Sequence, residues 1–178
     1  LLAGMRDAGA ETELIQLRDL ELKGCTGCYT CWVRTPGDCI HDDGMARAAG
    51  AMRGADLVVF GTPLYHYSMT GLMKTFLDRL LPEVQPWLVE DPARPGLTTH
   101  PRRHPQRPQQ AMLVSPCGFP EADHFGPLVQ TFRFVAERQV LALADRASDR
   151  VRVRRANQRR GGADDRIIGA RPGNGFLH

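Results

Sequence analysis

The sequence predicts an α/β fold with a mostly parallel sheet. A continuous apolar run at residues 55–61 is bounded by glycines and rich in β-branched side chains, which is typical of a strand buried on both faces. Amphipathic stretches with helical spacing lie on either side of it, at residues 43–53 and 71–81. A second strand candidate at residues 110–115 precedes another amphipathic stretch at 123–137. This alternation of strands and helices indicates a parallel α/β sheet.

Weaker elements precede the first strong helix. Residues 1–9 fit the end of a helix that a glycine terminates. Residues 11–17 predict a short strand, and their polar side chains favour an edge position. Asp42 or Asp43 is well placed to cap the helix at 43–53. The apolar face of that helix consists of Met45, Ala48, Ala49 and Met52.

Two segments carry no helical or strand pattern. Residues 82–108 contain seven prolines and are expected to form a long irregular loop. Residues 138–178 contain ten arginines and four aspartates, a net charge of +6, with only a weak strand candidate at 139–144. No aromatic residues interleave with these arginines, so nucleic-acid binding is not expected. We expect one domain over residues 1–137, followed by a basic, divergent or poorly ordered tail.

The composition favours a cytoplasmic enzyme. The chain has 178 residues, enough for a single domain with a real core. No apolar run approaches the roughly 18 residues that a membrane span requires, and no signal peptide is recognisable. Thiols stay reduced in the cytoplasm, where clustered cysteines more often hold a metal or carry out redox chemistry than form disulfides.

One candidate site is the segment that joins the strand at 55–61 to the helix at 71–81. In open parallel sheets, ligands bind beyond the carboxyl ends of the strands, where such segments lie. Pro63 stiffens the turn, hydroxyl groups and backbone amides can donate hydrogen bonds, and Tyr65 and Tyr67 offer flat faces. These hydrogen-bond donors and flat faces suit a planar ring with polar edges. An ordinary connection whose polar residues cap the helix remains equally compatible with the pattern.

The second candidate site is a run of cysteines with the spacing Cys-x2-Cys-x2-Cys-x7-Cys, formed by Cys25, Cys28, Cys31 and Cys39. Three thiols at this pitch followed by a fourth are typical of iron–sulfur loops. Structural zinc sites usually place two Cys-x-x-Cys pairs further apart. Reduced thiols without a metal, a zinc ion and a redox disulfide remain alternatives. Cys117 lies outside the run, and either lines the first site or packs.

Several other charged residues and histidines could belong to a site, but each has a simpler local explanation. Lys74, Asp78 and Arg79 are expected on an exposed helix face with local ion pairs, although contact with a ligand or a partner is an alternative. His100 and His104 lie among arginines of the proline-rich segment, where a role in metal binding is not expected.

These motifs together carry a family resemblance. Residues 24–32 with 39–43, residues 55–79 and residues 115–121 resemble the corresponding segments of the flavodoxin-like NAD(P)H-dependent FMN reductases, a group that includes the iron–sulfur flavoproteins. The similarity covers roughly residues 1–137. It implies a flavodoxin-like, doubly wound parallel sheet with helices on both faces. The family begins with a strand and a phosphate-binding loop, so we expect this chain to be N-terminally truncated and to lack both.

The resemblance also implies a cofactor and its site. FMN would lie at the carboxyl edge of the sheet, commonly in a homodimer. Its isoalloxazine ring would be bordered by Thr62, Pro63, Leu64, Tyr65 and His66, with Ser115, Cys117 and Gly118 on the other side. If the chain belongs to the iron–sulfur branch, the resemblance implies a [4Fe–4S] cluster held by Cys25, Cys28, Cys31 and Cys39.

The implied activity is an FMN-dependent NAD(P)H oxidoreductase. Hydride would pass from the nicotinamide to the flavin and on to a quinone, another flavin or an iron–sulfur acceptor. Two alternatives stay open: a flavodoxin-like electron carrier without enzymatic activity, and a zinc-stabilised binding module that uses the basic tail.

Overall fold

A computed structural model describes residues 1–92, 94–104, 109–136 and 166–171. Its helices are α1 (Leu2–Asp7), α2 (Thr30–Val33), α3 (Met45–Gly54), α4 (Gly71–Asp78) and α5 (Gly126–Val135). Its strands are β1 (Glu11–Gln16), β2 (Leu57–Gly61), β3 (Val89–Glu90), β4 (Thr98–Thr99), β5 (Gln110–Val114) and β6 (Arg166–Arg171). Short 3-10 helices are η1 (Leu17–Leu20), η2 (Leu81–Glu83) and η3 (Ala122–Phe125). Among the described residues, no helix has the length and apolar character that crossing a membrane requires.

The main sheet has the strand order β1-β6-β2-β5, with β1 at an edge as predicted. Strands β2 and β5 are parallel, with Phe60 opposite Leu113. Strand β6 lies between β1 and β2 and is antiparallel to both. The expectation of a mostly parallel, doubly wound sheet is therefore met by the pair β2 and β5 and is wrong at this central position. The sequence did not reveal β6 because its six residues include two arginines and a glycine. The strand candidate at 139–144 lies outside the described residues.

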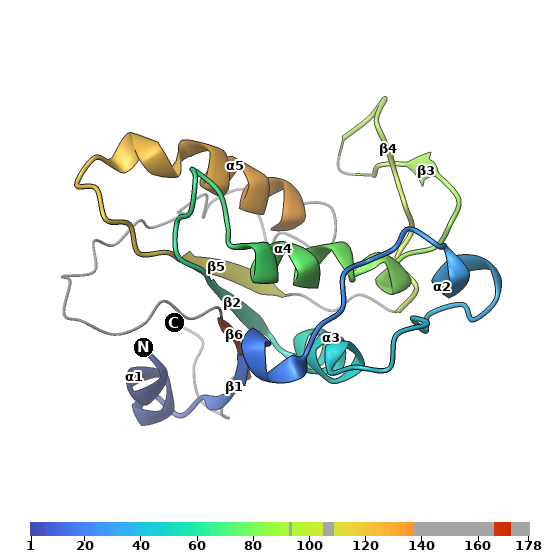
Figure 1. Cartoon of the computed structure of the whole chain (residues 1–178). Helices are drawn as coiled ribbons and strands as arrows, with labels where there is room; N and C mark the ends of the chain where they lie inside the picture. Colours follow the sequence, from blue (N-terminus) through green and yellow to red (C-terminus); the bar gives the residue numbers. More distant parts are fainter. Residues whose placement is uncertain (93, 105–108, 137–165, 172–178) are drawn as a thin grey trace.

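Strand β2 is buried on both faces, as its apolar run predicts. Val58 and Phe60 point to one face and Val59 to the other, and all three are almost fully buried. Val58 and Phe60 belong to a core that also contains apolar residues of α3, α4 and α5. Figure 1 shows α4 and α5 side by side along the sheet. Phe60 and Phe132 of α5 pack with their ring centroids 5.2 Å apart.

The ends of the helices differ by a few residues from the bounds predicted from the sequence. Helix α4 begins where the Thr70 hydroxyl accepts a hydrogen bond from the Met73 amide, and it ends at Asp78, three residues earlier than predicted. Helix α5 begins at Gly126, after the 3-10 turn η3, with a proline in its first turn. Near the start of α3, Asp43 Oδ1 accepts a hydrogen bond from the Met45 amide, so Asp43 caps this end as expected.

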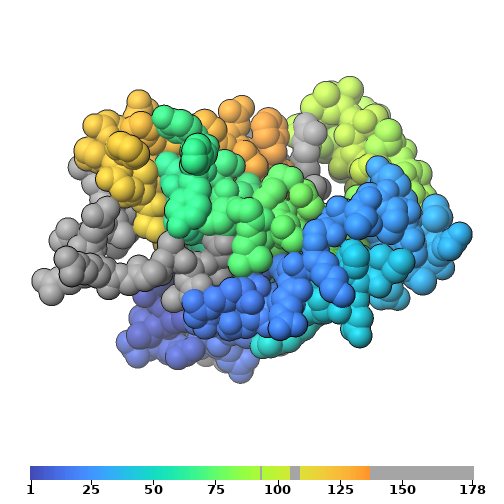
Figure 2. All heavy atoms as spheres, in the orientation of Figure 1, coloured from blue at the N-terminus to red at the C-terminus, as the bar shows by residue number. Residues whose placement is uncertain are grey.

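The proline-rich segment contains more order than its composition suggests. Strands β3 and β4 form a small antiparallel hairpin within it, so the expectation of a wholly irregular loop is wrong here. The hairpin packs against the cysteine segment through Trp32, whose indole lies 5.1 Å from the His100 ring. The Trp32 Nε1 donates hydrogen bonds to the carbonyls of Leu81 and Val84, each at 3.1 Å. Figure 2 shows the surfaces of the two segments meeting at one end of the molecule.

The side chain of Gln109 joins β5 to α3. Its Nε2 donates to the carbonyls of Met52 at 2.8 Å, Arg53 at 3.3 Å and Ala55 at 2.6 Å. These carbonyls lie at the end of α3, where the helix itself supplies no donors. A single buried amide thus caps the helix and fixes it beside the parallel strand pair.

A buried ion pair joins α4 to the residue that caps α3. The Arg79 side chain is 1% exposed, so its expected position on an exposed helix face is wrong. Arg79 is the C-cap residue of α4: its amide still donates to the Thr75 carbonyl at 3.2 Å, and its side chain turns inward. Its Nη1 and Nη2 donate to the two carboxylate oxygens of Asp43 at 2.8 and 3.1 Å. The expected local ion pair of Lys74 with Asp78 is confirmed at 2.6 Å.

The ion pair shifts the pKa of both Asp43 and Arg79. Burial by itself raises the pKa of the Asp43 carboxyl, but hydrogen bonds from Arg79 and from the amides of Lys23 and Met45 outweigh it and lower the pKa to about 2. Burial by itself lowers the pKa of Arg79, but Asp43 and the nearby Cys39 outweigh it and raise the pKa. Both groups are therefore charged at neutral pH.

We expect the protonation of Asp43 to destabilise the fold in acid. The pKa of Asp43 falls from an ordinary 3.8 to about 2 in the folded chain. Its contribution, roughly 2 kcal/mol of unfolding free energy, is therefore complete above pH ~5 and is lost as the pH falls through about 2. Urea unfolding at pH 2–7 should show a shallower acid dependence for Asp43→Asn than for wild type. Asp19→Asn, which changes an exposed carboxylate, serves as the control. Parallel pH profiles for wild type and Asp43→Asn would contradict the assignment.

Candidate functional site

The two segments predicted to bind a ligand lie together at the carboxyl edge of the sheet. Because β2 and β5 are parallel, the segments that follow them leave the sheet at the same edge. The Thr62 amide donates to the Val114 carbonyl at 3.1 Å, and the Leu64 amide donates to the Pro116 carbonyl at 2.9 Å. The sheet pairing thus continues past both strands and brings residues 62–68 beside residues 115–119.

The first residues of the loop after β2 face inward. Thr62 is almost fully buried, and its hydroxyl accepts a hydrogen bond from the Thr70 amide at 3.2 Å, which closes the loop. Pro63 is buried and Leu64 partly buried. Their side chains hold the loop in shape, and the surface of this edge comes from the residues that follow.

Those residues form a tight turn from Tyr65 to Ser68. The amide of each of these two residues donates to the carbonyl of the other at 2.9 Å. The central residues, His66 and Tyr67, have positive φ angles of 46° and 63°, the backbone of a type I′ turn. Side chains larger than glycine usually occupy this conformation at a cost of about 1 kcal/mol or more each. Strain of this kind is concentrated at functional loops.

The turn presents an aromatic surface that includes residues the sequence analysis did not select. Tyr65 and Tyr67 are more than half exposed. Tyr67 stacks on His124 with centroids 5.6 Å apart, and Phe119 lies 5.0 Å from the same ring. The His124 Nε2 is 3.5 Å from a Glu121 carboxylate oxygen. His124 lies in η3, three residues after the segment at 115–121, and the fold places its ring against Tyr67 from the other loop.

The segment after β5 contributes a hydroxyl group without a partner. The Ser115 Oγ is buried and makes no hydrogen bond, although buried hydroxyls in proteins are normally paired. The nearby Cys117 sulfur accepts a hydrogen bond from the Phe119 amide at 3.4 Å. At Gly118, an added Cβ would meet no atom within 4 Å. This edge therefore combines the unpaired hydroxyl of Ser115, open space at Gly118 and the flat faces of Tyr65 and Tyr67. Such a combination fits a planar ligand with polar atoms on its rim.

One hollow on the surface lies elsewhere. Its volume is about 330 Å³, and none of its residues comes from the two loops at the carboxyl edge. It is lined by Asp19, Leu20, Glu21, Lys23, Asp42, Asp43, Gly44 and Arg47. This hollow adjoins the end of the cysteine segment.

The four clustered cysteines differ in their surroundings. Cys25 and Cys28 are exposed, Cys39 is partly buried and Cys31 is buried. Hydrogen bonds from the side chain and amide of Thr30, with one from Thr26, lower the pKa of Cys28 to about 7. Burial raises the pKa of Cys31, and the charges of Cys39, Cys28 and Cys25 raise it further. Cys31 is therefore close enough to each of the other three sulfurs for their charges to affect its pKa.

The donor chemistry of this cluster fits a soft metal centre. Four thiols from one short segment are the ligand set of common iron–sulfur clusters. The sulfurs are not held in a finished coordination geometry: among the residues that the structure describes, no group of three or more Cys, His, Asp or Glu side chains is arranged to hold a metal ion.

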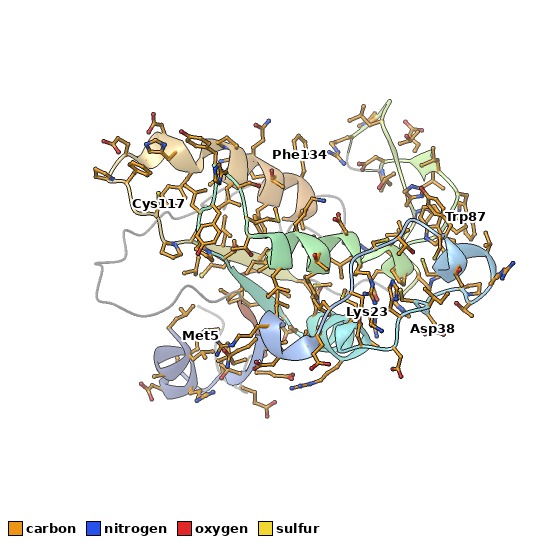
Figure 3. All side chains as sticks on the ribbon, viewed as in Figure 1. Met5, Lys23, Asp38, Trp87, Cys117 and Phe134 are labelled. Atoms are coloured by element: carbon orange, nitrogen blue, oxygen red, sulfur yellow. The ribbon has the colours of Figure 1, made fainter. Side chains whose placement is uncertain are left out.

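The two candidate sites lie at opposite ends of α4. Figure 3 shows Cys117 toward one end of this helix, and toward the other end Lys23, just before the cysteine segment, and Asp38, within it. Thr70, where the loop after β2 is closed, caps the start of α4, and Arg79 follows its last turn. A helix of eight residues is about 12 Å long. One short helix therefore links both sites within the chain.

Comparisons with known proteins agree with this arrangement. The sequence model of the NADPH-dependent FMN reductase family matches residues 1–113. An iron–sulfur flavoprotein of Archaeoglobus fulgidus is 39% identical over 75 residues, which cover 42% of this chain and 36% of the relative. An iron–sulfur flavoprotein of Methanocaldococcus jannaschii is 33% identical over 81 residues, which cover 46% of this chain and 41% of the relative.

These matches have a limited extent. The chain spans about two fifths of the length of the curated relatives it matches. No solved structure matches it. The family model, however, covers more than half of the residues and includes the cysteine segment, the loop after β2, helix α4 and most of β5. The chain thus belongs to the NADPH-dependent FMN reductase family.

Proposed function

We propose that this chain is the FMN-binding part of a flavin-dependent oxidoreductase that takes hydride from NAD(P)H. The observation that carries the proposal is the junction of residues 62–68 with residues 115–119 at the carboxyl edge of the parallel strand pair. Ligands of open α/β sheets bind at such edges. Membership of the FMN reductase family supplies the identity of the ligand.

The residues at this edge would bind the flavin in distinct ways. Tyr65 and Tyr67 offer faces against which a ring can stack, and His124 supports Tyr67 from behind. Ser115 Oγ is free to donate to a polar atom on the ring's rim. Thr62 and Pro63 hold the loop in shape from inside rather than touching the ring with exposed side chains. When bound, the flavin supplies the capacity to accept hydride from nicotinamide.

We further propose that the cysteine segment holds an iron–sulfur cluster. Cys25, Cys28, Cys31 and Cys39 would be the ligands, and the cluster would supply one-electron transfer. The curated relatives are named iron–sulfur flavoproteins, and the four thiols share one short segment. The final acceptor in this proposal is a quinone, a second flavin or such a centre.

A homodimer would complete the flavin edge. Tyr65, Tyr67 and Phe119 leave large aromatic surfaces exposed there, and a second copy of the chain could cover them together with the bound ring. This proposal predicts an association that strengthens when FMN is bound.

The direct test of the function is reduction of bound flavin by nicotinamide. The chain should be loaded with FMN, freed of unbound flavin and mixed with NADPH or NADH without oxygen. We expect the visible absorbance of the flavin to disappear and to return on addition of a quinone. A chain that binds FMN but keeps its flavin absorbance with both nicotinamides would be an electron carrier, which would contradict the enzymatic proposal.

Ser115→Ala tests the flavin edge itself. Because the hydroxyl has no partner among the residues that the structure describes, its loss should leave the free energy of unfolding unchanged or slightly higher. The dissociation constant for FMN, measured by quenching of flavin fluorescence, should rise by up to ~10-fold because one hydrogen bond is lost.

Thr131→Ala, which removes a hydroxyl on α5 that bonds to the Pro127 carbonyl, is the matched control and should bind FMN as wild type does. Equal FMN affinity in wild type and Ser115→Ala would remove Ser115 from the proposed site.

A further inference from the structure

The cysteine segment is fastened at both of its ends to one buried side chain. Lys23 lies two residues before Cys25, and Asp43 lies four residues after Cys39. The Arg79 Nη1 donates to the Lys23 carbonyl at 2.6 Å and to Asp43 Oδ2 at 2.8 Å. The same carboxylate oxygen accepts a hydrogen bond from the Lys23 amide at 3.1 Å. The guanidinium thus closes the segment into a loop against the end of α4.

The same guanidinium lies next to one of the cysteines. Cys39 is close enough for its charge and hydrogen-bonding capacity to raise the pKa of Arg79. Among the residues that the structure describes, the buried Arg79 Nε has no hydrogen-bond partner of regular geometry. An arginine that is 1% exposed therefore keeps one N–H group unpaired beside a thiol.

A purely structural explanation accounts for this arrangement poorly. Removing two charges from water costs several kcal/mol for each ion, so a buried ion pair often stabilises a fold no more than apolar side chains of similar volume. The unpaired Nε adds to that cost. The arrangement gains a physical purpose if the neighbouring cysteine segment becomes strongly anionic.

Metal binding would make the cysteine segment strongly anionic. Metal-bound cysteines are thiolates, and four thiolates bring four negative charges, of which a divalent ion cancels only two. A fixed positive charge beside Cys39 would offset part of the remainder, and a donor aimed at a ligating sulfur is the usual outer partner of such a ligand. Of the four cysteines, Cys39 is the one that contributes to the raised pKa of Arg79.

We infer that Arg79 is a positioning residue for a metal centre formed by the four cysteines: it fixes both ends of their loop and holds a positive charge against Cys39. This inference rests on the metal site proposed above. It adds a residue from α4, the helix that begins at the proposed flavin loop, to the residues on which that site depends.

Cobalt provides a probe that needs neither flavin nor nicotinamide. Co²⁺ should be titrated into the full, reduced chain without oxygen, with the thiolate-to-cobalt charge-transfer absorbance as the readout. Arg79→Met should weaken Co²⁺ binding by ~10-fold or more, the usual effect of losing an outer partner. Arg79→Lys, which keeps the charge, should recover part of the loss. Lys74→Met, on the exposed face of the same helix, should bind as wild type does.

Arg79→Met leaves Asp43 buried without its partner and can unfold for that reason alone. The double variant Arg79→Met with Asp43→Asn removes both charges, and its fold is checked by circular dichroism. We expect this folded variant to bind Co²⁺ as weakly as Arg79→Met. After reconstitution with iron and sulfide, the reduction potential of the centre should be more negative in Arg79→Met than in Lys74→Met, a shift that a merely structural role would not produce.

Two results would overturn the inference. One is a folded double variant that binds Co²⁺ as tightly as wild type. The other is a wild-type chain that shows no thiolate-to-cobalt band at all. Neither depends on flavin chemistry, so a failure of the proposed oxidoreductase activity would be seen separately from a failure of this inference.

Discussion

The ion pair between Arg79 and Asp43 is the constraint on which the arrangement of this molecule depends. It joins three segments that are distant in sequence: the residue before the cysteine loop, the residue that caps α3, and the end of α4. Besides this ion pair, the loop that carries four cysteines is held by the hydrogen bonds of Trp32 to the Leu81 and Val84 carbonyls and by its packing on the proline-rich hairpin. Because both charges are almost fully buried, removing either one would leave the other in a poorly solvating interior.

Helix α4 transmits this constraint to the other end of the molecule. Its first turn is capped by Thr70, whose amide is held by the buried hydroxyl of Thr62. Thr62 in turn pairs with the end of β5, which fixes the strained turn at Tyr65–Ser68 beside Ser115. The same few hydrogen bonds thus set the position of the aromatic edge relative to the cysteine loop. If the proposed flavin and cluster are both bound, this fixed separation sets the distance over which electrons would pass between them.

The sequence was informative where a pattern is local. The apolar run of β2, the spacing of the cysteines and the amphipathic stripe of α4 could all be read from consecutive residues, and the structure bears out the burial of β2 on both faces. The parallel pairing of β2 and β5 then followed from alternation alone. The flavin and metal ligands chosen from the resemblance remain predictions, although the structure does bring both flavin segments to one edge.

Other features could not be predicted because they arise from contacts between distant residues. The inward position of Arg79 depends on the Lys23 carbonyl and the Asp43 carboxylate, which lie 56 and 36 residues away in the sequence. Strand β6 fills the centre of the sheet in antiparallel orientation with a short, arginine-flanked sequence that has no strong strand pattern. The stacking of His124 on Tyr67 arises only through the fold, and Gln109 caps α3 from more than fifty residues away.

Native-state hydrogen exchange of two amides tests the central constraint most directly. The amides of Lys23 and Met45 donate to the two carboxylate oxygens of Asp43, so both depend on the position that Arg79 gives this carboxylate. If the ion pair holds the cysteine loop on α4, these amides exchange only through global unfolding and as slowly as those of β2. Exchange of the Lys23 amide at the rate of an open loop, while β2 stays protected, would contradict the account.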